Sequence, residues 1–95
     1  MSAPEPAFVV ERYWPGSSPD EFERMTARLA TEISLTGGGV TLLHSTYVPA
    51  DDALQWVIRA PSAAVVEALC AAAGVPFERL LPAIESPDGL PRNVG

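Results

Sequence analysis

Two helix-start signals, each placed directly after a strand-like segment, constrain the fold of this 95-residue chain more than any other feature. The first is Ser17-Ser18-Pro19-Asp20-Glu21, in which Ser18 can cap a helix, Pro19 suits its first position and Glu21 completes a capping box. The second, Ala60-Pro61-Ser62, repeats the pattern with a serine cap. The sequence therefore predicts two helices, each preceded by a strand.

The rest of the chain supplies the remaining strands and the helix ends. We predict strands over residues 8–14, 40–48, 54–59 and 79–85, because these runs are rich in β-branched and apolar residues and are bounded by turn residues. Residues 49–52 form the turn between the second and third strands. The first helix should end near Gly37-Gly38-Gly39, and the second should end at Gly74, since Pro76 prevents continuation. The apolar side chains spaced for the buried face of the first helix are Phe22, Met25, Leu29 and Ile33.

The resulting order, β-α-β-β-α-β, is that of the ferredoxin-like α+β fold, a four-stranded antiparallel sheet with two helices on one face. In the strand order 4-1-3-2 the fourth strand is an edge, which suits Pro82 because proline cannot donate a ladder hydrogen bond. We expect a single domain over residues 7–85, preceded by a flexible arm (1–6) and followed by a tail (86–95).

Two helices on one face leave the opposite sheet face bare, and a bare apolar face is an association hazard. A second copy packed sheet to sheet around a two-fold axis is the simplest cover, so we expect a homodimer of the dimeric α+β-barrel kind. Such a dimer can enclose a pocket. The strand aromatic residues expected to contribute to it are Tyr13, Trp14, Tyr47 and Trp56.

Composition excludes several classes of partner. The net charge is −6 and all six basic residues are arginines, so clustered positive charge for nucleic acid or an anionic membrane is lacking. No apolar run approaches the roughly 20 residues that span a bilayer, and no secretion signal is recognisable, so we expect a cytoplasmic protein. The single cysteine, Cys70, cannot form an internal disulfide and lies in an apolar helical stretch, where we expect it to be buried.

The candidate for chemistry is His44, the single histidine, placed inside the second strand. Imidazole suits nickel, zinc and copper, but carboxylates must join it to make a site. Glu11 stands out because it lies mid-strand among apolar residues, where a carboxylate needs a partner, which could equally be an arginine. The other acidic candidates are Asp51, Asp52 and Glu85.

The register of the second and third strands decides which face His44 occupies. If Pro49 pairs with Leu54, His44 lies opposite Arg59 and shares its face. If the pairing slips by one residue, His44 shares its face with Trp56 and Ile58. The sequence alone leaves both registers open.

Four segments in series resemble a family of small ferredoxin-like (dimeric α+β-barrel) domains described as nickel-binding proteins. They are residues 8–15 (FVVERYWP), 39–45 (GVTLLHS), 60–62 (APS) and 73–79 (AGVPFER). The resemblance implies a homodimer that binds Ni²⁺ through histidine and carboxylate ligands, and by position it matches Glu11 and His44. One departure is Arg59, where the family pattern usually has an acidic residue.

Three functions follow from these observations. The first is a metal-binding protein in which His44 and Glu11 hold nickel near a dimer interface. The second is an enzyme or ligand-binding protein related to small cyclases, isomerases or cofactor-free monooxygenases, with an apolar or aromatic ligand in a sheet-face pocket. Its pocket candidates are Tyr13, Trp14, Tyr47, Trp56 and Arg59. The third is an interaction module whose sheet face only dimerises.

Overall fold

The computed structural model describes residues 6–83. Along the chain the elements are β1 (Ala7–Tyr13), α1 (Pro19–Ser34), β2 (Thr41–Val48), the 3-10 helix η1 (Pro49–Asp51), β3 (Ala53–Arg59), α2 (Ala63–Ala73) and β4 (Arg79–Ala83). This order confirms the predicted ferredoxin-like α+β fold. The tail, the arm except Pro6, and the last two residues of the fourth predicted strand lie outside the described residues.

Both helices begin where the sequence signals place them and α2 ends at the predicted residue, whereas α1 ends at Ser34, three residues before the predicted Gly37-Gly38-Gly39. The Ser18 hydroxyl accepts a hydrogen bond from the Glu21 backbone N–H at 3.2 Å and donates to the Glu21 carboxylate at 3.1 Å. Ser62 caps α2 by accepting from the Val65 backbone N–H at 3.4 Å. Gly74 then ends α2 with a φ of 69°, a left-handed conformation that glycine adopts without steric cost. Caps of this kind each contribute about 1 kcal/mol to stability.

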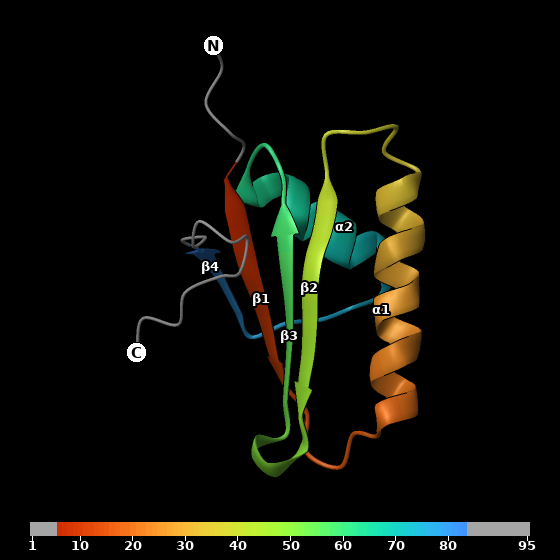
Figure 1. Ribbon diagram of the computed structural model, residues 1–95, viewed down its shortest axis with the longest axis vertical. Coiled ribbons are helices and arrows are strands. Elements are labelled where there is room, and N and C mark those ends of the chain that lie inside the picture. Colours follow the sequence, from red (N-terminus) through yellow and green to blue (C-terminus); the bar gives the residue numbers. More distant parts are fainter. Residues whose placement is uncertain (1–5, 84–95) are drawn as a thin grey trace.

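The four strands form one antiparallel sheet in the order β2-β3-β1-β4, with both helices on one side of it (Figure 1). This is the predicted order, read from the opposite edge. Pro82 of β4 pairs with Phe8 of β1, and β4 is an edge strand, as a proline in a strand requires. The predicted turn over residues 49–52 is confirmed: residues 49–51 form a 3-10 turn and Asp52 follows with a φ of 50°.

The core lies between the sheet and the two helices. Trp56 is at its centre and is fully buried, and its ring stacks on Phe22 of α1 with ring centroids 5.8 Å apart. Its indole N–H donates to the Thr26 hydroxyl at 2.9 Å, so the one polar atom of this side chain is satisfied. The other large side chains that are fully buried are Val10, Met25, Leu29, Leu54, Ile58, Val66, Cys70 and Val75.

The register of β2 against β3 matches neither of the two alternatives left open by the sequence. His44 pairs with Val57 and not with Arg59, so the pairing in the first alternative is wrong by two residues, although its consequence, that His44 and Arg59 share a face, is confirmed. Ser45 pairs with Trp56, which puts the histidine on the opposite face from the tryptophan and makes the second alternative wrong as well.

A β-bulge in β2 explains this outcome. Leu42 pairs with Ile58, and the next pair along the ladder joins His44 to Val57, so Leu43 is an extra residue in β2. An uninterrupted strand would turn Leu42 and His44 to the same face, because side chains alternate. The bulge instead lets Leu42 pack against the core while His44 points to the helix-free face.

Candidate functional site

A row of polar side chains crosses the helix-free face of the sheet. Arg79 of β4 pairs with Glu11 of β1, Glu11 pairs with Gln55 of β3, and Gln55 pairs with Thr46 of β2. Since directly paired residues point to the same face, these four side chains form one continuous line over all four strands, which we call the polar row. His44 lies beside this row, two residues from Thr46 on the same strand.

Thr46 fixes the orientation of the exposed His44 ring. The Thr46 Oγ1 atom lies 2.7 Å from His44 Nε2, within hydrogen-bond distance. When Nε2 carries the proton and donates to Thr46, the other ring nitrogen, Nδ1, keeps its lone pair. A hydrogen bond on one imidazole nitrogen is the usual way in which a protein orients the other nitrogen for a metal.

Glu11 is partly buried, and both of its carboxylate oxygens have a partner. The Gln55 side-chain amide donates to Oε2 at 3.2 Å. Arg79 Nη1 lies 4.0 Å from Oε1, and the Arg79 side chain is 64% exposed against 28% for Glu11. The prediction that Glu11 needs a partner is therefore confirmed, and one of its partners is an arginine.

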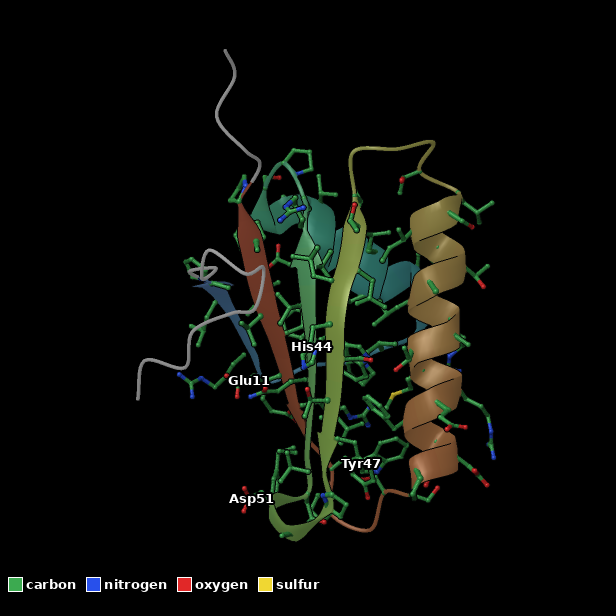
Figure 2. The ribbon with its side chains drawn as sticks, in the orientation of Figure 1. Glu11, His44, Tyr47 and Asp51 are labelled. Atoms are coloured by element: carbon green, nitrogen blue, oxygen red, sulfur yellow. The ribbon has the colours of Figure 1, made fainter. Side chains whose placement is uncertain are left out.

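Three of the four aromatic pocket candidates do not lie on this face. Trp56 is in the core, and Tyr47 stacks on Phe22 and donates its hydroxyl hydrogen to the Ser17 carbonyl at 2.8 Å. Figure 2 shows Tyr47 on the α1 side of β2. Trp14 packs against the core, and the Arg12 guanidinium lies 4.2 Å from the centre of its ring. The expectation that Trp56 and Tyr47 face the bare side is wrong, because the observed register turns both toward the helices.

Two further candidates do lie on the helix-free face. Tyr13 is on the same face as Glu11 and is 59% exposed. Arg59 pairs with Thr41 and Ala7, on the same face as Val57, and it is half-buried. This face therefore carries an aromatic ring, a guanidinium, an imidazole and a carboxylate.

The other acidic candidates are remote from His44. Asp51 is exposed in the hairpin loop beyond the end of the sheet, whereas Glu11 and His44 lie midway along their strands (Figure 2). Asp52 follows it, and its backbone carbonyl accepts from the Trp14 N–H at 2.8 Å. Glu85 lies outside the described residues. Glu11 is thus the candidate carboxylate that shares the sheet face with His44.

His44 and Glu11 are the right types of ligand for a divalent transition metal, but two ligands are too few to hold one. Imidazole and carboxylate are both ligands for nickel and zinc. However, residues 6–83 contain no group of three or more histidine, cysteine or acidic side chains that could hold a metal ion. Glu11 and His44 are also separated by β3, so their strands lie roughly 10 Å apart. Ligands from one copy alone do not complete a site.

Cys70 supplies no metal ligand at this site. It lies on the buried side of α2, as predicted, and burial raises its pKa from 9.0 to about 11. The neutral thiol is therefore favoured in the folded state, and the stability that this gives is present below pH 9 and is lost as the pH rises through about 11.

We expect a thiol reagent at pH 8 to label Cys70 slowly in native protein and rapidly in urea, which a mass-spectrometric time course measures. Rapid labelling of native protein would contradict this burial.

Comparisons with known proteins support the fold. No protein-family model matches this sequence, and no curated protein matches it either. Among solved structures, the crystal structure of SCO4226 from Streptomyces coelicolor A3(2) is similar over 85% of this chain and 95% of its own chain, with a TM-score of 0.64. The two sequences are 22% identical, so the likeness establishes a shared ferredoxin-like fold and nothing about activity. Neither helix within residues 6–83 is long and apolar enough to cross a membrane.

Proposed function

We propose that this protein is a homodimer that binds a divalent transition metal, with nickel as the first candidate, on the helix-free face of its sheet. The ligands are His44 and Glu11 of both copies. The observation that carries the proposal is the placement of an exposed imidazole, oriented by Thr46, on the same face as a partly buried carboxylate.

A second copy supplies what one copy lacks. One chain offers two ligands, one imidazole and one carboxylate, and two chains offer four, which is a sufficient set for a transition metal. The face is also suited to association, because it carries apolar side chains beside the polar row. These are Val9, Tyr13, Val48 and Leu81.

Isothermal titration calorimetry of metal-stripped protein with Ni²⁺ tests whether the protein binds a transition metal. We expect saturable uptake of Ni²⁺ and no comparable uptake of Mg²⁺, because imidazole ligands favour borderline transition metals whereas Mg²⁺ prefers oxygen ligands alone. Equal binding of both cations would indicate non-specific attraction to an acidic chain. Absence of nickel binding would overturn the proposal.

Leu81→Glu should make the protein monomeric without unfolding it. Leu81 lies on the helix-free face and is 37% exposed in the single copy, so its replacement leaves the core intact but puts a charge into the proposed interface. The matched control is Leu35→Glu after α1, where the leucine is 74% exposed and distant from this face. In sedimentation velocity we expect wild type and Leu35→Glu to be dimers and Leu81→Glu a monomer. A dimeric Leu81→Glu would place the interface elsewhere.

A second candidate function is favoured by the side chains of Arg59 and Tyr13 on the same face. In a dimer they could anchor an anionic aromatic ligand, with His44 or Glu11 as acid or base, as in small cyclases, isomerases or cofactor-free monooxygenases. Two of the walls that we expected for this pocket, Trp56 and Tyr47, belong to the core. Without these two pocket walls, the enzyme function is less well supported than metal binding. Thermal stabilisation of the protein by aromatic carboxylates, with none by nickel, would favour the enzyme over the metal-binding protein.

A further inference from the structure

The polar row contains a cation at the place where a metal would have to bind. Arg79 Nη1 faces Glu11 Oε1, while Gln55 holds the other carboxylate oxygen, Oε2. A metal ion that takes Glu11 as a ligand therefore meets one oxygen held by a neutral amide and one held by a positive charge.

The two partners of Glu11 differ in how readily they can leave. Gln55 is on the inner strand β3, is half-buried and makes a hydrogen bond of 3.2 Å. Arg79 is on the edge strand β4, is 64% exposed and makes a longer contact of 4.0 Å. Because β4 is an edge strand, the Arg79 side chain can move away from Glu11 past the rim of the sheet, whereas Gln55 can stay and orient the carboxylate from behind.

The backbone holds Arg79 opposite Glu11 even though its side chain is exposed. The residue before it, Glu78, donates its backbone N–H to the Glu11 carbonyl at 2.9 Å. The Glu78 carboxylate in turn accepts from the Tyr13 backbone N–H at 2.9 Å. These two bonds fix the start of β4 against β1, so Arg79 begins the strand within reach of Glu11.

We propose that Arg79 is a built-in competitor for the carboxylate of Glu11 and thereby sets the affinity of the site for a divalent cation. This inference rests on the proposed function. When no metal is present, the guanidinium neutralises Glu11; when a metal binds, the guanidinium must give up the carboxylate and remain near a second positive charge. Arg79 acts through Glu11 and is a positioning residue, not a ligand.

Arg79→Gln should bind nickel roughly five- to tenfold more tightly than wild type. An exposed ion pair changes an equilibrium by a factor of about 1.5 to 5, and removal of a like charge beside the divalent ion adds to this. Arg79→Lys keeps the charge and should bind nickel as wild type does. The control Arg24→Gln makes the same change in net charge on the exposed side of α1 and should leave the affinity unchanged.

Calorimetric titration of the four proteins with Ni²⁺ decides between the outcomes, with urea unfolding of the metal-free forms to show that all remain folded. Tighter binding by Arg79→Gln alone supports the inference. Equal affinity of Arg79→Gln and wild type overturns the inference and leaves the proposed function standing. No binding by either protein overturns both. Binding by Arg79→Gln only would support competition for Glu11 and would overturn the proposed function of the natural chain.

Discussion

Replacing Trp56 with alanine should lower the free energy of unfolding by about 3–5 kcal/mol, the range measured when a buried aromatic side chain is deleted from a core. Trp56 is fully buried on β3 and stacks on Phe22, so deletion leaves a cavity between the sheet and α1. Small domains are stable by only about 5–15 kcal/mol, so this variant should be close to unfolded. Urea denaturation followed by circular dichroism measures the change, and a loss below about 1 kcal/mol would contradict the packing described.

A milder pair of variants tests the same packing in protein that stays folded. Thr26→Val removes the acceptor of the Trp56 indole N–H and should cost about 1–3 kcal/mol, because a buried donor is left without a partner. Thr31→Val is the matched control on α1, since its hydroxyl donates only to the Ala27 carbonyl on the exposed side of the helix. We expect it to change stability by less than about 0.5 kcal/mol.

His44→Ala should weaken nickel binding by about a hundredfold or more. Loss of a partner that merely orients a ligand already costs about 10–100-fold in metal affinity, and this change removes a ligand from each copy. His44 is exposed, so the variant should fold and dimerise like the wild type. Equilibrium dialysis against Ni²⁺, with the bound metal counted by atomic spectroscopy, measures the loss.

The control for this variant is the neighbouring residue on the other face of β2. Ser45 pairs with Trp56 and points to the helix side, so Ser45→Ala should bind nickel as the wild type does. Thr46→Val removes only the group that orients the His44 ring and should have an intermediate effect. Unchanged affinity in His44→Ala would exclude the histidine from the site.

Much of the fold follows from short-range signals in the sequence. The Ser18 and Ser62 caps and the Gly74 end of α2 were all predicted at the correct residues, because capping chemistry depends on residues three or four apart. The edge position of β4 followed from Pro82 in the same way. Predicted strand boundaries were within one residue at the start of β2 and β3, where the ladder begins at Thr41 and Ala53.

The face of each strand residue could not be predicted in the same way. The bulge at Leu43 has no glycine or other local mark in the sequence, and it alone turns His44 away from the face of Leu42. Trp56 and Tyr47 were assigned to a pocket because aromatic residues suit both cores and binding sites. Their true face depends on pairing between strands, which is long-range information.

The partners of the candidate ligands were missed for the same reason. Gln55, Thr46 and Arg79 become a row with Glu11 only when β4, β1, β3 and β2 are placed in register. The usable signal was that each is a polar residue at a strand position alternate to core residues. That signal groups the side chains of one strand on a shared face, but it gives neither which face of the sheet this is nor the neighbour on the next strand.

Native mass spectrometry of the metal-stripped wild type, titrated with Ni²⁺, tests most directly whether two copies make one metal site. We expect a dimer that takes up one nickel ion, with the residual monomer free of metal, because one copy supplies only two of the four ligands. Nickel bound equally well to the monomer, or a dimer that binds none, would contradict the proposal.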